Sequence, residues 1–485
     1  MNKLDKDIIE KLAYRVAELG GRAYMVGGAV RDEIMKRPIK DVDIEVHGIS
    51  EAVLEAVLKE LGKPLRFGSA FGVYSLAGHQ IDIALPRSER KSGSGHRDFE
   101  IEIDPFIGIR EAARRRDFTM NALLKDILSG EIADPYGGTE DIKNRIIRHI
   151  DDKKFGEDPL RALRAAQFRS RFGFQVAPST ISICRALDLR NLSAERVELE
   201  MKKALLESRR PSEFFECLRE MGQLGYWFKE LEQLIGLEQN PKFHPEGDVW
   251  THTMMVLDRA AHFRPCVSDP YAFMLLALTH DFGKITTTEF VNGAIHAYGH
   301  ELQGAEIAER FLDRVCHGSD IKKYIANMIP NHMRPNKIAE ARSAVKKTNR
   351  MFDDAASPSD LIYFAICDKT KLPYLEANKC EPNETHETHE TQGNIDIESE
   401  LYTDDEKSRE QERIKFLFDR LDLYRDMMAR PYVTGKDLIN RGIMPGDDFG
   451  TILEYAHKLR LAGVSKDDAL KQTISYARKL RKNIK

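Results

Sequence analysis

Two hydrophobic periodicities alternate along the first part of the chain. Short runs that are apolar, or that alternate apolar and polar residues, predict β-strands at 23–26, 41–46 and 80–85. Apolar residues at helical spacing flank these runs and predict helices at 3–19, 29–36 and 51–61. This mixture indicates a small domain in which helices pack on a sheet.

From about residue 156 onward the periodicity is almost entirely helical, as in EDPLRALRAAQFRSRF, SAERVELEMKKALLES and PSEFFECLREMGQLGYWF. We therefore expect an α+β chain, in which a small mixed-sheet head is followed by a mostly α-helical body. Shifts in pattern and composition divide it into a head, a helical neck, a middle domain, a linker and a helical tail, at 1–150, 151–239, 240–375, 376–410 and 411–485.

The composition supports folded domains and predicts no membrane span. Hydrophobic residues make up 42% of the 485 residues and charged residues 31%, which provides enough apolar side chains for cores. Mean hydropathy is −0.45, and no apolar run approaches the ~18 residues of a spanning helix. The N-terminal pattern is charged and amphipathic, unlike a signal peptide, and six scattered cysteines without CxxC predict reduced thiols. These features predict a cytoplasmic protein.

Charge is unevenly distributed along the chain. The formal net charge is −4, from 74 basic and 78 acidic residues. Residues 381–410 hold eleven acidic side chains against two basic ones and include the run NETHETHETQGN, so we interpret them, with His386 and His389, as a solvated acidic linker. The segments 161–171 and 471–485 are basic and contain no acidic residue, which suits contact with an RNA backbone.

The head carries two motifs that suit phosphate chemistry. Gly27 and Gly28, in VGGAVRD, end a predicted strand and begin a predicted helix, where backbone amides can approach a phosphate closely. Asp41 and Asp43 are two residues apart on a predicted strand, so both side chains point to one face. Two such carboxylates repel each other unless a cation lies between them, and Mg²⁺ prefers carboxylates together with substrate phosphates. Asp82, on a neighbouring predicted strand, is a candidate third carboxylate.

Four blocks occur in order over about 150 residues: GGAVRDEIMKRPIKDVDIEV, RRRDFTMNALLKD, DPYGGTEDIKNRIIRHI and FGEDPLRALRAAQFRSRFGF. Together they resemble the class II CCA-adding tRNA nucleotidyltransferases and their poly(A) polymerase relatives, which makes 1–150 a nucleotidyltransferase head. The resemblance implies that Asp41 and Asp43 hold catalytic Mg²⁺ ions. It also implies that Gly28 and Arg31 contact the incoming triphosphate and that Arg116 adds a phosphate contact.

The block EDPLRALR in the neck places Asp158, Arg161 and Arg164 on roughly one face of a helix. The resemblance implies that Asp158 and Arg161 select the base. Cytosine and adenine each present an amino donor beside a ring-nitrogen acceptor, which a carboxylate and a guanidinium can match, whereas uracil and guanine mismatch both groups. Gln167 stands where the family often has another arginine, which weakens one contact and leaves Arg164 to bind nucleotide.

A second constellation lies in the middle domain. His252, in FHPEGDVWTHTMMVLDRAA, and the adjacent His280 and Asp281, in LLALTHDFGK, resemble the HD phosphohydrolase superfamily, and FAICDKTK adds Asp368. Imidazole and carboxylate ligands suit a divalent transition metal, which acidifies bound water for attack on a phosphoester. Further candidate ligands are His296, His300 and His332. The resemblance implies 2′,3′-cyclic phosphodiesterase or phosphatase activity for this HD domain.

The resemblance as a whole predicts a CCA-adding tRNA nucleotidyltransferase that binds tRNA, CTP and ATP. Segment 86–113 corresponds to the flexible loop that the family uses in changing from C to A addition, which favours full CCA addition. Residues 431–470 resemble the C-terminal segment of these enzymes and predict a tRNA-binding tail. The alternatives are a poly(A) polymerase, an enzyme that adds only C or only A, and an HD-type hydrolase with a nucleotide- or tRNA-sensing head. The sequence leaves the oligomeric state and the HD metal open.

Overall fold

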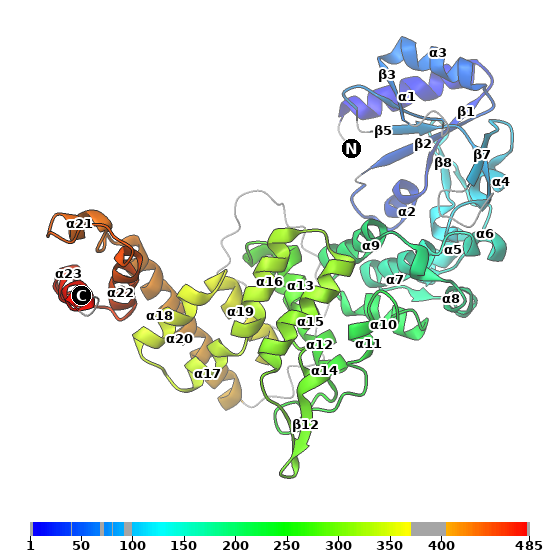
Figure 1. The fold of residues 1–485 in the computed structure, drawn as a ribbon. Helices are drawn as coiled ribbons and strands as arrows, with labels where there is room; N and C mark the ends of the chain where they lie inside the picture. The colour runs from blue at the N-terminus through cyan, green and yellow to red at the C-terminus, as the bar shows by residue number, and fades with distance from the viewer. Residues whose placement is uncertain are drawn as a thin grey trace. The chain divides into compact units, whose positions relative to one another are not determined.

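The computed structural model describes residues 3–39, 41–67, 72–79, 81–91, 99–369 and 404–482. The chain divides into two compact units, residues 1–229 and 230–485 (Figure 1). The predicted head and most of the predicted neck belong to the first unit, and most of the predicted middle domain and the predicted tail belong to the second. Most of the predicted linker, 376–410, lies outside the described residues, and the helix α20 begins before its predicted end, at Asp404.

The first unit contains a seven-stranded sheet with the strand order β3-β4-β5-β2-β1-β8-β9. Its strands are β1 (Arg22–Val26), β2 (Val42–His47), β3 (Pro64–Phe67), β4 (Val73–Leu76), β5 (Ile81–Ala84), β8 (Leu124–Asp126) and β9 (Ile132–Ala133). The three strands predicted from the sequence are confirmed as β1, β2 and β5. β2 is parallel to β5 and antiparallel to β1, which makes the sheet mixed, as predicted.

The side chains of β2 alternate between the apolar core on one face of the sheet and the candidate site on the other. Val42, Ile44 and Val46 are buried in an apolar core shared with α1 (Lys3–Glu18) and α3 (Glu51–Leu61). Because successive side chains of a strand point to opposite faces, Asp43 lies on the other face, where it is exposed. α1 and α3 match predicted helices and contact each other over this core (Figure 1).

The predicted flexible loop, 86–113, contains regular structure. β6 (Arg87–Lys91) and β7 (Phe99–Ile103) pair antiparallel, and α4 (Ile109–Arg114) follows them. Residues 92–98 lie outside the described residues. The segment therefore supplies a β-hairpin and a short helix next to the sheet.

The rest of the first unit is mainly helical, as the periodicity predicts. α7 (Leu160–Phe172) packs against α9 (Ala194–Glu207) and α10 (Ser212–Glu220), and Gly173, at φ +67, ends it. The remaining elements are α2 (Gly28–Ile34), η1 (Thr119–Asn121), α5 (Gly138–Lys143), α6 (Asp152–Gly156), α8 (Pro178–Arg185), η2 (Leu189–Asn191) and the parallel pair β10 (Ile146–Ile147) and β11 (Gln175–Val176).

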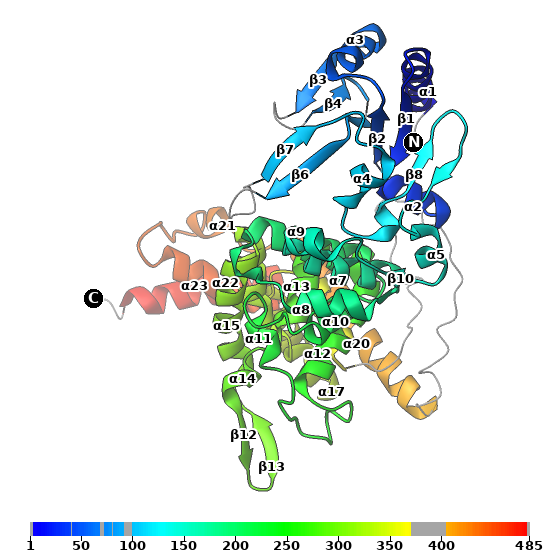
Figure 2. The same cartoon turned by 90° about the vertical axis from the view of Figure 1, so that its right-hand side faces the viewer.

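The second unit is built almost entirely from helices. α13 (Pro270–Thr279) is buried except at its first residue, because its side chains are nearly all apolar. A hairpin of β12 (Thr288–Val291) and β13 (Ala294–Ala297) projects from the helices (Figure 2). The other elements of this part are α11 (Lys229–Glu232), α12 (Val249–Ala260), η3 (Ala261–Cys266), α14 (Lys284–Thr287), α15 (His300–Val315), α16 (Ser319–Asn331), α17 (Arg334–Glu340), α18 (Val345–Asp354) and α19 (Pro358–Lys369).

The C-terminal helices complete the second unit. α20 (Asp404–Ala429) packs on α17, α18 and α19. α21 (Gly435–Ile439), α22 (Phe449–Leu461) and α23 (Lys466–Lys482) enclose a separate small core around Leu438 and Ile452. Among the helices of the described ranges, none has the length and hydropathy needed to cross a bilayer.

The cysteines agree only in part with the prediction of reduced thiols. Cys184, Cys217, Cys316 and Cys367 are buried and form no disulfide. Cys266 is disulfide-bonded, which corrects the prediction at that position.

Candidate active sites

The first candidate site gathers the three predicted carboxylates where the adjacent inner strands β2 and β5 begin. β2 pairs in parallel with β5 so that Asp43 is opposite Asp82, and both side chains are exposed. Asp41 immediately precedes β2 and is exposed as well. The pairing of β2 with β5 thus brings Asp43 and Asp82 into register, and Asp41 lies two residues before Asp43, just outside the strand.

The electrostatics of Asp43 fit a bound cation. Surrounding protein partly desolvates its carboxylate and raises its pKa, and the charges of Asp82 and Asp41 raise it further, while Arg116 opposes them. A divalent cation would relieve this repulsion, and the donor set, three carboxylates with access from solvent, suits a hard ion that also binds substrate phosphates.

The predicted glycine turn leaves the sheet next to Asp43. Val26, the last residue of β1, pairs with Asp43, and Gly27 follows at φ +68, a conformation that favours glycine. A Cβ at Gly27 would lie 2.8 Å from Nη1 of Arg116, so a larger residue would displace that guanidinium. α2 then begins at Gly28.

The two predicted phosphate-binding arginines are held differently. Arg31 is 5% exposed; its Nη1 donates to Oδ1 of Asn121 at 2.6 Å, and its guanidinium lies 4.8 Å from the ring centre of Phe172. Arg116 retains some exposure, and its Nη2 donates to Oε2 of Glu45 at 3.4 Å. Arg116 is therefore the more accessible of the two.

Sequence reasoning missed Glu45. It is 2% exposed on β2, on the same face as Asp43, and its Oε1 accepts from Nε2 of His47 at 2.9 Å. Burial alone would raise the pKa of Glu45, but His47, Arg116 and Arg115 lower it to about 2. The available signal was the polar series Asp43, Glu45, His47 on one strand face. Glu45 anchors an arginine that lies beside the glycine turn.

The candidate base-selecting residues of the neck are partnered within the protein. The guanidinium of Arg161 donates to the backbone oxygens of Lys154 and Arg115, each at 2.7 Å. Asp158, which precedes α7, accepts from Nη2 of Arg196 at 2.9 Å. Arg164, on α7, donates from Nε to Oδ2 of the buried Asp117 at 2.6 Å. A base that used Asp158 would have to share it with Arg196 or replace that contact.

Gln167 is enclosed in the packing of α7. Its side chain is buried, and with its amide oxygen turned toward Arg171 it accepts from Nη1 of that residue at 3.0 Å. A neutral amide at this buried position avoids placing another cation next to Arg171.

The second candidate site brings together all four residues predicted for the HD site. They come from α12, from the end of α13 and from the last turn of α19. Nε2 of His252 lies 3.1 Å from Oδ1 of Asp368 and 3.7 Å from Oδ2 of Asp281. Nε2 of His280 lies 3.3 Å from the same Asp281 oxygen.

The buried polar atoms of this site fit a metal ion. Nε2 of His280 is buried and has no hydrogen-bond partner among the described residues, and the buried Oδ2 of Asp281 forms an ion pair with Nζ of Lys284 at 2.7 Å. Burial alone would raise the pKa of Asp281, but Lys284 and His280 keep it well below its ordinary value, so the carboxylate is charged. A buried nitrogen lone pair without a partner is costly unless a cation satisfies it, and a charged carboxylate beside it adds to the attraction for a metal ion.

Two of the three additional histidine candidates join this cluster. The ligand atoms of Asp281, His300 and His332 all lie within 4.8 Å of one another. Burial lowers the pKa of His332 to about 4, so its imidazole is neutral and can act as a ligand. His296 does not join them; its ring stacks on Tyr298. Asp281 thus has histidines on both sides.

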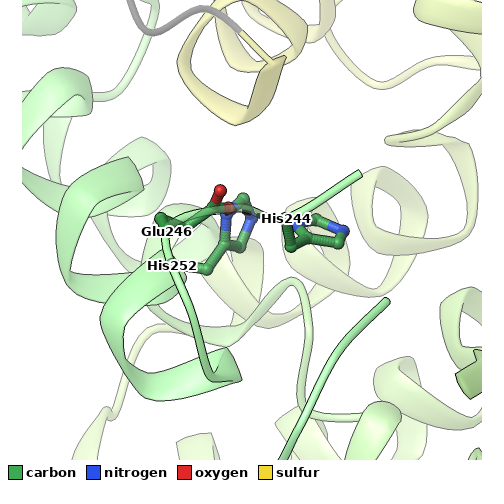
Figure 3. Close-up of side chains that lie close together, drawn as sticks. All are labelled: His244, Glu246 and His252. Carbon is green, nitrogen blue, oxygen red and sulfur yellow. Dashed lines mark hydrogen bonds and ion pairs between the residues drawn. The ribbon is translucent and has the colours of Figure 1, made fainter. Parts of the chain in front are cut away.

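Sequence reasoning missed two residues that support His252. Oε1 of Glu246 accepts from Nδ1 of His252 at 2.7 Å and from Nδ1 of His244 at 3.0 Å (Figure 3). Burial alone would raise the pKa of Glu246, but the two histidines hold it far below its usual range. The HPEGD sequence just before α12 was the available signal. This carboxylate fixes the His252 ring so that Nε2 faces Asp368.

A cavity of about 480 Å³ opens onto the second site. Asp281, His300, His332 and Asp368 line it, together with Lys284, whose Nζ lies 2.7 Å from Oδ2 of Asp281. The volume is in the range of small-molecule sites. A ligand in this cavity can therefore reach the candidate metal ligands.

The described residues of both sites lie mainly in regions that match known families. Residues 23–148 match the poly A polymerase head domain, and residues 249–372 match the HD domain. The chain is 37% identical over 326 residues to the multifunctional CCA protein of Actinobacillus pleuropneumoniae serotype 5b, covering 66% of this chain and 77% of that one. It is 36% identical over 369 residues to the Haemophilus ducreyi protein of the same name, covering 74% of this chain and 87% of that one.

Solved structures share the fold. The Thermotoga maritima CCA-adding enzyme complexed with tRNA has a TM-score of 0.63 at 18% identity, covering 98% of this chain and 96% of that chain. The Bacillus stearothermophilus CCA-adding enzyme in complex with CTP has a TM-score of 0.62 at 21% identity, with all of both chains covered.

Proposed function

This chain belongs to the multifunctional CCA protein family, and from that membership we propose how its two sites divide the chemistry of a tRNA 3′ end. The protein is a CCA-adding tRNA nucleotidyltransferase, which adds C and A from CTP and ATP without a nucleic-acid template. The single observation that best supports an active head is the register of Asp43 with Asp82, beside Asp41 and the glycine turn. It acts, we infer, in the cytoplasm, where tRNA and nucleotides meet.

In the head, Asp41, Asp43 and Asp82 would hold Mg²⁺, which supplies charge neutralisation and a more acidic attacking hydroxyl. The tRNA 3′-hydroxyl forms a bond to the α-phosphorus of the nucleotide, and the bond to pyrophosphate breaks. Arg116, held by Glu45, would contact the triphosphate beside the Gly27–Gly28 turn. Arg31 would contribute positive potential from its buried position behind that turn.

The neck would select the base. Asp158 would accept from the exocyclic amino group of C or A, and Arg161 would donate to the ring nitrogen. UTP and GTP would place an acceptor opposite the Asp158 carboxylate and a donor opposite Arg161. Both contacts would then be lost, and polar groups without partners carry a free-energy cost in a desolvated site. Arg164 would remain a nucleotide contact, and the basic α23 would bind the tRNA backbone without reading its sequence.

The defining test supplies tRNAs that end before CCA, after C and after CC. Each is incubated with purified protein, Mg²⁺ and one nucleotide at a time, and the 3′ ends are sequenced. We expect C to be added to the first two substrates and a single A to the third. Open-ended adenosine tails would contradict this function and favour poly(A) synthesis, and addition of one nucleotide type alone would favour a partial enzyme.

The second unit would hydrolyse a phosphoester. His252, His280, Asp281 and Asp368, joined by His300 and His332, would hold a divalent transition metal, which supplies a water acidic enough to attack phosphorus. Lys284 would stabilise charge near Asp281, and Glu246 would orient His252. The expected activity is opening of 2′,3′-cyclic phosphates, with phosphatase activity on the product.

Its test is metal-dependent hydrolysis of a nucleoside 2′,3′-cyclic phosphate. We expect His280→Ala and Asp281→Ala to remove the activity while nucleotide addition continues. Normal hydrolysis in both variants would refute this metal site.

A further inference from the structure

Two aromatic rings stack at the wall of the HD cavity. The rings of His296 and Tyr298 are 4.9 Å apart between centroids and only 10° from parallel. Both residues line the cavity that contains Asp281, His300 and His332. Tyr298 is nevertheless 70% exposed, so the outer face of this stack is available to a ligand.

The stack is fixed relative to the candidate metal ligands. His296 is in β13, and Tyr298 and Gly299 connect this strand to His300, the first residue of α15. Gly299, at φ +74, turns the chain, and Nδ1 of His300 donates to the backbone oxygen of Ala297 at 2.8 Å. A ligand on the stack is therefore held by the same short segment that positions a metal ligand.

The rest of the cavity suits a nucleotide better than a bare phosphate. Its volume of about 480 Å³ is in the range that holds a drug-sized molecule. Phe243, 65% exposed, also lines it, as does Lys337. Lys369 lines it too but is paired with Glu340 at 3.3 Å, and Glu238 and Glu301 add negative charge to the lining. Aromatic surface, the ammonium group of Lys337 and a metal-type cluster in one cavity match a base, a phosphate and a reacting phosphorus.

We propose that His296 and Tyr298 form a platform on which the base of an RNA 3′-terminal nucleoside stacks while its phosphoester reaches the HD cluster. This rests on the proposed hydrolase function and names the residues that would hold the base of its substrate. Every base has a π-face, so the platform accepts all four bases, unlike the selective neck. His296 supports the Tyr298 ring from behind, which keeps the platform flat.

The test compares two substrates that differ only in the base. One is an adenosine 2′,3′-cyclic phosphate and the other is the abasic ribose 2′,3′-cyclic phosphate. For Tyr298→Ala we expect KM for the adenosine substrate to rise about tenfold, the loss of one base stack, with kcat nearly unchanged. Both constants for the abasic substrate should remain as in the wild type. Tyr298→Phe should restore the wild-type KM because it retains the ring.

Phe290 provides the matched control. It is an exposed aromatic residue on the same hairpin, 74% exposed on β12, and it does not line the cavity. Phe290→Ala should leave both substrates unaffected. Equal losses on the two substrates in Tyr298→Ala would overturn the platform, because the residue would then act through the fold of the hairpin.

A binding measurement separates failure of the platform from failure of the hydrolase. Calorimetry on metal-free protein measures the affinity for adenosine 2′-monophosphate in the wild type and in Tyr298→Ala. Because any binding to the head is the same in both proteins, the difference between the two affinities reports the platform alone. Weaker binding in the variant supports the platform, even if the protein hydrolyses no cyclic phosphate. Absence of hydrolysis would refute the hydrolase function and not the platform. Unchanged binding, with hydrolysis intact, overturns the platform and leaves the hydrolase standing.

Discussion

His252 donates from Nδ1 to Oε1 of Glu246 at 2.7 Å. The opposite nitrogen of the same ring, Nε2, lies 3.1 Å from Asp368. A carboxylate behind an imidazole fixes the ring and raises its basicity toward a metal on the far side. This contact makes Glu246 a supporting residue of the HD cluster, although it is not a candidate ligand in the sequence motif.

Glu246→Gln should lower the metal affinity of the HD cluster by about 10- to 100-fold, the usual effect of losing such a supporting carboxylate. Competition with a chromophoric chelator measures the affinity directly. Glu289→Gln, an exposed glutamate on β12, is the matched control and should bind metal normally. Equal affinity in Glu246→Gln and the control would remove this role from Glu246.

The two activities should separate by mutation. Asp43→Ala should reduce nucleotide incorporation by about three orders of magnitude, because the cation site and its charge stabilisation are lost. Cyclic-phosphate hydrolysis should stay at the wild-type rate, since the HD residues belong to the other compact unit. His280→Ala should give the reverse pattern. If the protein were instead an HD-type hydrolase with a sensing head, the wild type would incorporate no nucleotide. The same two assays therefore test that alternative.

Loss of the neck contacts should relax nucleotide choice. Asp158→Ala and Arg161→Ala should each reduce the preference for CTP over UTP by about 10- to 100-fold, the discrimination expected of one base contact pair. The ratio of kcat/KM for the two nucleotides is the measurement. The exposed Lys202, on α9, offers a control through Lys202→Ala. Unchanged ratios in both neck variants would assign base selection elsewhere.

The buried Glu45 should make the head sensitive to acid. Its pKa is lowered to about 2, so its stabilising effect is complete above the unfolded pKa near 4.5 and is lost as pH falls from there toward 2. At about 1.4 kcal/mol per pKa unit, the contribution at neutral pH is of the order of 3 kcal/mol. Glu45→Gln should therefore be destabilised at pH 7 by a difference that shrinks below pH 4.5.

Thermal unfolding followed across this pH range measures the effect. The control is Glu131→Gln, an exposed glutamate next to β9. A Glu45→Gln deficit that stays constant between pH 7 and pH 3 would show that its charge is not the stabilising element. The same variant should raise KM for CTP, because Arg116 loses its anchor.

Local patterns predicted the elements that carry the chemistry. Strand alternation placed Asp43 on the face opposite Val42 and Ile44, and helical periodicity identified the body. The contact of Glu45 with Arg116 was beyond reach, because the two residues are 71 apart in sequence, whereas Glu246 lies close in sequence to both of its histidine partners. No local pattern specifies such a distant pairing.

The histidines illustrate the same limit. His296 and His300 are four residues apart, yet only His300 joins Asp281 and His332, while His296 stacks on Tyr298. The difference arises because Gly299 turns the chain between the hairpin and α15. Spacing in a mixed strand–turn–helix segment does not determine which ring points inward.

The parallel register of β2 and β5, with Asp43 opposite Asp82, constrains how this gene can tolerate insertions and deletions. A slip of one residue in β5 would move Asp82 to the face now occupied by Ile81 and Ile83, and would bring those apolar side chains to the solvent. The connection between the two strands contains α3, β3 and β4. A change in its length is harmless only if one of its loops absorbs the change before β5 begins. Insertions and deletions in the head should therefore occur in its turns and not within its strands, even where the core accepts substitutions.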